Sequence, residues 1–279
     1  SYGKIVTVAY KRTNLLVSGE GEDVIVLFAP KGSPVPVIEM KPLVCFLREK
    51  YTVMVFDYLG SGFSDNYHTE RTLENITNEI HEVIQELGYT SYTIIAQSYA
   101  GLYSLYYANK YAGEVKAVIG IDTYVTEQID NNNFVEDAKF IKDLRIDFHD
   151  SKVAQWIVEK LAVMHLKKAR NYMYSKKDLQ AYSLLASCTL KNVMLLNEYN
   201  CEYENFETLR NISFPSHIPV LFLLSSYRCK MIYRWHDMHK KLLRNNDSKI
   251  ITLRGSKDLH LRQFERIAVE ADVFLSLIK

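Results

Sequence analysis

The sequence of 279 residues predicts an α/β fold: a doubly wound, mostly parallel sheet that is interrupted once by helices. Six short apolar runs lack the polar alternation of a strand with one exposed face, and this pattern is typical of parallel strands covered on both faces. Amphipathic helical patterns lie between several of these runs, as in right-handed βαβ units. A long stretch without strand signals separates the fourth run from the fifth.

The first four apolar runs and their helices make up the first part of the predicted sheet. The runs lie at residues 24–28, 53–56, 93–96 and 118–121. Apolar residues recur at helical spacing after Thr72, which can cap the helix, and Gly88 follows the last of them. This part therefore predicts alternating strands and helices.

The stretch from 123 to 215 is rich in Asn, Lys, Asp and Tyr and predicts a helical lid. Its two amphipathic segments lie at 152–169 and 178–196. The strand rhythm returns at 220–224, followed by a helix, a strand at 250–253 and a last helix. We therefore expect a core of residues 1–122 and 216–279 with a cap inserted at 123–215.

Composition argues against several classes of protein. With 34 Lys and Arg against 33 Asp and Glu, no net charge draws the chain to nucleic acid or to an anionic membrane. No apolar run reaches the roughly 20 residues that a membrane-spanning helix needs. The four cysteines are widely spaced and are expected to be reduced thiols, which favours the cytoplasm. Because the chain begins at Ser1 rather than Met, an extracytoplasmic protein with a removed leader or anchor stays open.

The most informative segment is the pentapeptide Ala96-Gln97-Ser98-Tyr99-Ala100, which lies between a predicted strand and a predicted helix. It matches the pattern G-x-S-x-G with alanine at both small positions. In that pattern a serine occupies a strained turn, and larger flanking side chains would clash as the helix leaves the strand. Ser98 is thus a candidate nucleophile. Taken alone, the pentapeptide equally fits a buried serine that starts a helix.

Through this pentapeptide and four further features, the chain resembles the α/β-hydrolase superfamily over nearly its whole length. Residues 57–65 are similar to the family's D-x-x-G-x-G-x-S-D loop, and residues 29–33 stand where the family has its oxyanion loop. Residues 255–260 resemble the histidine loop, and the helical insertion stands where the family carries a cap. The resemblance implies a member with a serine nucleophile and a helical cap. Relatives with aspartate nucleophiles, such as epoxide hydrolases, are disfavoured by Ser98.

The predicted general base is His260. Imidazole has a pKa near operating pH, about 6.5, and can accept the proton of a serine hydroxyl. Of the eight histidines, only this one lies in the loop after the last predicted strand. His236 and His239 are spaced at i and i+3 on a predicted helix, but no third ligand is near, so we expect a solvated helix face rather than a metal site.

The predicted orienting acid is Asp122. Many family members carry this acid after the seventh strand, but the segment after residue 224 offers no carboxylate. Asp122 ends the strand before it, and Ser98, Asp122 and His260 follow the family's chain order. The alternatives are a triad without an acid and, more distantly, Asp57. Asp258 is expected to be solvated.

The oxyanion hole needs two backbone N–H donors. Tyr99, directly after the nucleophile, is expected to supply one of them. Pro30 has no N–H, so Lys31 is expected to supply the other from the loop after the first apolar run. The Lys31 side chain itself is expected to point to water, and the alternative is that it favours an anionic group of the substrate.

The sequence thus predicts a serine hydrolase that cleaves an ester or related acyl bond of a small molecule through an acyl-enzyme, without metal or organic cofactor. One alternative is an aminopeptidase similar to proline iminopeptidases, which would use acids of the lid to bind a substrate ammonium. Candidates for these acids are Glu127, Asp130, Glu136 and Asp137. An alternative of another class is a non-catalytic ligand-binding member of the fold, because no acid follows the strand at 220–224.

Overall fold

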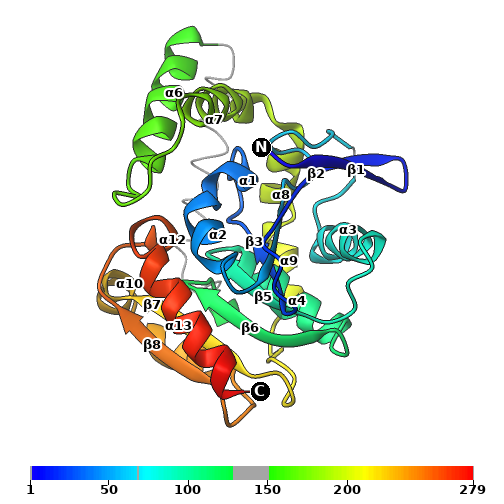
Figure 1. Ribbon diagram of the computed structural model, residues 1–279, viewed down its shortest axis with the longest axis vertical. Helices are drawn as coiled ribbons and strands as arrows, with labels where there is room; N and C mark the ends of the chain where they lie inside the picture. The colour runs from blue at the N-terminus through cyan, green and yellow to red at the C-terminus, as the bar shows by residue number, and fades with distance from the viewer. Residues whose placement is uncertain (1, 68, 128–150, 279) are drawn as a thin grey trace.

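The computed structural model describes residues 2–67, 69–127 and 151–278, and its centre is a sheet of eight strands in the order β1-β2-β4-β3-β5-β6-β7-β8 (Figure 1). The strands from β3 to β8 are parallel, and β2 is antiparallel to both of its neighbours. The strands are β1 Lys4–Val8, β2 Lys11–Ser18, β3 Val24–Phe28, β4 Thr52–Phe56, β5 Tyr92–Gln97, β6 Val115–Ile121, β7 Val220–Ser225 and β8 Lys249–Leu253. The predicted fold class is confirmed.

The six predicted strands are all present, but the hairpin of β1 and β2 was not predicted. Ala9 and Tyr10 form its turn with φ values of +47° and +67°. Such two-residue turns usually contain Asn-Gly or Asp-Gly, because both central residues need positive φ. Without those residues the hairpin leaves little trace in the sequence.

Helices cover both faces of the sheet, so that two apolar layers lie on its two sides. One layer packs α3 and α4 against side chains such as Val26 and Phe28, and the other packs α1, α2 and α13 against Ile25 and Leu27. The helices are α1 Pro36–Glu39, α2 Lys41–Leu47, α3 Leu73–Glu86, α4 Ala100–Lys110, α6 Lys152–Leu166, α7 Lys176–Cys188, α8 Val193–Asn200, α9 Glu202–Thr208, α10 Ser226–Met231, α11 Trp235–Lys241, α12 Leu259–Arg262 and α13 Phe264–Leu277.

Helices α6 to α9 lie between β6 and β7 in the chain. Helices α6 and α7 pack against each other at one end of the molecule (Figure 1). The single helix expected at 178–196 is broken: α7 ends at Cys188, and α8 begins only at Val193. Asn192 explains the new start, because its side chain accepts a hydrogen bond from Leu195 N at 3.0 Å and so caps α8.

Asp57, which follows β4, joins β2, the start of α1 and the loop after β4. Its buried carboxylate accepts hydrogen bonds from Val37 N, Phe63 N and Asn14 Nδ2 at 3.0, 3.0 and 2.8 Å. Burial raises the pKa of Asp57 to about 6, against these three donors. Gly62 makes the approach possible: its φ is +54°, and a Cβ there would lie 2.1 Å from Asp57 Oδ2. Asp57 thereby fixes the start of α1.

Replacing Gly62 by Ala is expected to destabilise the protein more than replacing Gly88 by Ala. Both glycines have positive φ, but a Cβ at Gly88 meets no atom within 4 Å. Gly88→Ala should cost about 1 kcal/mol of unfolding free energy from backbone strain alone. Gly62→Ala should cost about 1–3 kcal/mol more, because the added methyl collides with a buried carboxylate. Urea unfolding measures both, and equal losses would contradict the role given to Asp57.

Candidate active site

Ser98 lies at the sharp turn between β5 and α4, as the pentapeptide predicts. Its φ is +55°, and its backbone is held by a hydrogen bond from Ser98 N to Ile121 O at 3.0 Å. Ala96 and Ala100 are fully buried on either side. The capping position of α4 is Tyr99, without a side-chain cap, so Ser98 does not serve as the helix cap. A strained turn that presents a serine is the geometry of a nucleophile elbow.

The serine opens into a cavity of ≈ 440 Å³ between the sheet and the inserted helices. Arg228, Lys257 and His260 follow β7 and β8 and contribute to its lining. The inserted helices supply a largely apolar side: Val158, Leu161, Ala162, His165, Tyr182 and Ala186. Ser98 and His260 thus share one cavity, but among the described residues no hydrogen bond joins them.

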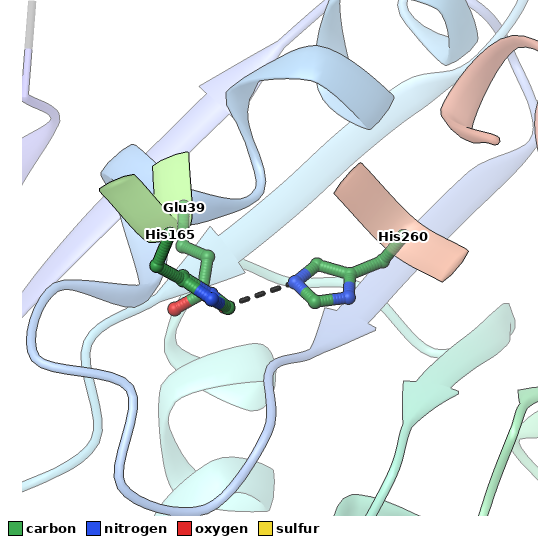
Figure 2. Close-up of side chains that lie close together, drawn as sticks. All are labelled: Glu39, His165 and His260. Atoms are coloured by element: carbon green, nitrogen blue, oxygen red, sulfur yellow. Dashed lines mark hydrogen bonds and ion pairs between the residues drawn. The ribbon is translucent and has the colours of Figure 1, made fainter. Parts of the chain in front are cut away.

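His260, at the start of α12, is buried and bonded to an acid that the sequence did not predict. Its Nε2 lies 2.9 Å from Glu39 Oε1, whereas none of the described residues offers a partner to its Nδ1 (Figure 2). Because an ionised carboxylate only accepts hydrogen bonds, Nε2 carries the proton and Nδ1 keeps a free lone pair.

Glu39, the last residue of α1, is 2% exposed, and its carboxylate accepts four hydrogen bonds. Oε1 accepts from His260 and also from His165 Nε2, again at 2.9 Å. Oε2 accepts from Tyr182 OH at 2.7 Å and from Ser33 Oγ. Burial alone would raise the pKa of Glu39, but the charge and hydrogen bonds of the two histidines outweigh it and hold this pKa well below its usual value.

His165 approaches the carboxylate from α6 and has charged neighbours of its own. Burial acts to lower its pKa, but the charge of Glu39 outweighs burial, so the pKa of His165 is raised. Its Nδ1 lies 3.3 Å from Lys168 Nζ and 4.0 Å from Asp258 Oδ1. Lys168 and Asp258 form an ion pair at 2.8 Å, so Asp258 is not solvated as expected.

Asp122 does not contact His260, and this part of the prediction needs correction. Its carboxylate accepts from Ser225 N and Ser225 Oγ, both at 2.9 Å, and lies 3.2 Å from Arg228 Nε. Burial raises the pKa of Asp122, in spite of the Arg228 charge. The reason is local: β6 pairs with β7, so the end of β7 and the first turn of α10 reach Asp122 before His260 can.

The two predicted oxyanion donors lie next to the cavity. Neither Tyr99 N nor Lys31 N donates to any of the described residues. The Lys31 side chain does not point to water: Nζ lies 2.6 Å from Glu202 Oε1 and over the rings of Tyr99 and Tyr199 at 3.9 and 4.3 Å. This ion pair joins the loop after β3 to helix α9.

Comparison with known proteins gives the same fold. A family model described as alpha/beta hydrolase fold matches residues 33–167. Protein YbdG of Bacillus subtilis, which is uncharacterized, is 24% identical over 276 residues, 95% of this chain and 83% of its own length. ALR0039, an α/β-hydrolase-type protein from Nostoc sp PCC 7120, superposes with a TM-score of 0.77 at 15% identity, over 98% of this chain and 97% of its own.

The chain has the α/β-hydrolase fold. Solved structures with the same fold include the epoxide hydrolase VrEH1 from Vigna radiata, with a TM-score of 0.71 and 15% identity over 98% of this chain and 97% of its own. An enol-lactonase from Burkholderia xenovorans LB400 has a TM-score of 0.68 and 16% identity over 98% of this chain and 100% of its own. At such identities the likeness concerns the fold.

Other residues predicted for the site lie elsewhere in the structure or outside the described residues. Glu127 pairs with Lys241 at 2.8 Å and lines a different hollow. Asp130, Glu136 and Asp137 lie outside the described residues. His239 is buried, with Nδ1 2.8 Å from Trp235 O, so the solvated helix face expected there is wrong. No helix of the described ranges has the length and apolar character needed to cross a bilayer.

Two residues of the site, Glu39 and His165, were missed. Glu39 is the one acid in the apolar run from Val35 to Met40, and a lone acid there is a signal of a buried carboxylate. His165 is one of several polar residues on an amphipathic helix and carries no such signal. Its partner is 126 residues away in the chain.

Asp122→Asn is expected to lower the free energy of unfolding by about 3 kcal/mol. Asparagine can still accept from Ser225 N, but it leaves the buried Arg228 guanidinium without its counter-charge. The control is Asp237→Asn, which breaks an exposed pair with Arg234 and should change stability by less than about 0.5 kcal/mol. Urea unfolding measures the free energy of unfolding of both variants. Equal losses in the two would show that the Asp122–Arg228 pair does not stabilise the fold.

Proposed function

We propose that this α/β hydrolase cleaves an ester or lactone bond of a small molecule, with Ser98 as nucleophile, His260 as base and Glu39 as orienting acid. The observation that carries the proposal is the His260–Glu39 hydrogen bond at the edge of the cavity into which Ser98 opens. Glu39 takes the role that the sequence had assigned to Asp122.

The chemistry follows from the tautomer of His260. Glu39 accepts the Nε2 proton and stabilises the imidazolium that forms during the reaction. Nδ1 accepts the proton of Ser98 as Oγ attacks the acyl carbon, and later donates it to the leaving oxygen. Hydrogen bonds of this kind are often loose before substrate binds and tighten in the complex. Water then cleaves the acyl-enzyme by the same steps.

The backbone N–H groups of Tyr99 and Lys31 are proposed to stabilise the oxyanion. Both are without acceptors among the described residues. The Lys31–Glu202 ion pair supports this role, because it holds the side chain away and leaves the backbone of the loop to face the substrate.

Residues 123–215 are proposed to act as the cap that selects the acyl group. The apolar side chains of α6 and α7, among them Val158, Leu161 and Ala186, line the cavity. Its volume of ≈ 440 Å³ suits a small molecule. A solved enol-lactonase with this fold acts on a cyclic ester, whereas the aspartate nucleophile expected of epoxide hydrolases is replaced here by Ser98.

Labelling by a fluorophosphonate tests the nucleophile. The probe should add to Ser98 in the intact protein, and Ser98→Ala should lose both labelling and turnover of p-nitrophenyl esters. Ser104→Ala is the control, because Ser104 lies on α4, the helix that follows Ser98, with its hydroxyl donating to Gly101 O at 2.8 Å. Modification of another serine would refute the assignment. A ligand that raises the melting temperature without turnover or labelling would indicate a non-catalytic binding protein.

Glu39→Gln is expected to lower kcat for ester hydrolysis by about 10²–10⁴-fold, because the amide no longer selects the Nε2–H tautomer or stabilises the imidazolium. Asp122→Asn should keep kcat within about threefold of the wild-type value at a temperature where the variant is folded, because Asp122 contacts Ser225 and Arg228 and not His260. Circular dichroism verifies folding of both variants. If Asp122→Asn proves the slower enzyme, Glu39 is not the orienting acid.

A further inference from the structure

We propose that Glu39, His165 and His260 also bind a zinc-class divalent metal ion, and that the bound ion switches the hydrolase off. The three side chains come from α1, α6 and α12 and converge on one point (Figure 2). Metal binding is inferred from these residues alone. Only the inhibitory effect rests on the proposed function.

The donor atoms have the spacing of a metal site. Each histidine Nε2 lies 2.9 Å from Glu39 Oε1, and one possible ligand atom from each of the three residues lies within 4.8 Å of the other two. Zinc binds nitrogen and carboxylate oxygen at about 2.0–2.2 Å, so two ligands at right angles to each other lie about 2.9 Å apart and two tetrahedral ones about 3.3 Å apart. An ion can therefore take the place of the two hydrogen bonds with only small movements of the side chains, as the proton of each ring moves from Nε2 to Nδ1.

The ligand types select the class of ion. Two imidazoles and one carboxylate suit zinc and its first-row neighbours, whereas magnesium and calcium prefer oxygen ligands alone. All three residues line the cavity, which gives the ion a way in and leaves its remaining positions open to water or to a ligand. A closed structural site would not have this opening.

The surroundings of the three ligands also fit a cation. Tyr182 and Ser33 hold the second oxygen of Glu39, which fixes the carboxylate. Asp258 Oδ1 lies 4.0 Å from His165 Nδ1, where Lys168 Nζ is now the neighbour at 3.3 Å, so a small movement would let Asp258 accept a hydrogen bond from Nδ1 once Nε2 binds metal. Glu39 and Asp258 carry two negative charges against the single positive charge of Lys168, so a neutral pair of histidines leaves the cluster at −1.

The same atoms explain how the ion would stop catalysis. Without metal, the neutral ring of His260 carries its proton on Nε2 and has its lone pair on Nδ1. A metal on Nε2 needs that lone pair, so the proton of the ring moves to Nδ1 and no proton is released. Nδ1 then donates a hydrogen bond and cannot accept the Ser98 proton. His260 therefore cannot bind the metal ion and accept the Ser98 proton at the same time.

Cobalt titration followed by optical spectroscopy tests the binding. Chelator-treated protein should take up one equivalent of Co²⁺ with visible d–d bands, and Zn²⁺ should displace it. His165→Gln and His165→Ala should each weaken binding by more than about 100-fold, the upper end of the cost of losing an outer-sphere partner. The matched control is His81→Gln. His81 lies on α3, outside the cluster, and is bonded to Glu114, so this variant should bind cobalt as the wild type does.

Ester turnover tests the inhibition. Zinc should inhibit the wild type reversibly, with full recovery on chelation, and should inhibit the His165 variants far less, each relative to its own chelator-treated rate. Ser98→Ala should bind cobalt normally, so a protein without esterase activity still tests the site. Absence of stoichiometric binding, or undiminished binding in folded His165 variants, overturns the metal site. Binding at the site without inhibition overturns the switch.

Discussion

The site depends on the burial of one charge, the Glu39 carboxylate. An ionised group removed from water is costly unless hydrogen bonds replace its hydration. Here the replacement comes from four side chains in four segments: Ser33 in the loop after β3, His165 on α6, Tyr182 on α7 and His260 on α12. The buried Glu39 carboxylate therefore connects the loop after β3, the inserted helices α6 and α7, and α12 around a single cavity.

Two further ion pairs with little exposure join the core to the inserted helices α7 and α9. Lys31 pairs with Glu202 on α9, and Lys41 pairs with Asp178 at the start of α7 at 2.5 Å. Losing one partner of such a pair leaves an uncompensated charge, so each pair penalises displacement of the helices more than it adds to overall stability. The loop after β3, which lies beside Ser98, is thus positioned by residues far away in the sequence.

The fold could be predicted because its signals are local. Each buried parallel strand is a short apolar run, and the turn at Ser98 is encoded by five consecutive residues. His260 could be found from its place after β8. The orienting acid could not be predicted, because the sequence shows which carboxylates end a strand but not which side chains contact them. Asp122 forms an ion pair with Arg228, whereas Glu39, 221 residues from His260 in the chain, forms the hydrogen bond to it.

The presence of His165 is the remaining point that a hydrolytic triad does not explain. An orienting acid needs one imidazole, and a second one on the same oxygen withdraws charge from the carboxylate that should stabilise His260. Such a contact weakens the base if its only effect is to share protons. It becomes understandable if the carboxylate has two alternative states, one with protons between the three groups and one with an ion in their place. Which state is populated would determine whether Nδ1 of His260 keeps its lone pair, and the half-buried His165 on α6 would thereby control the reactivity of Ser98 at the turn after β5.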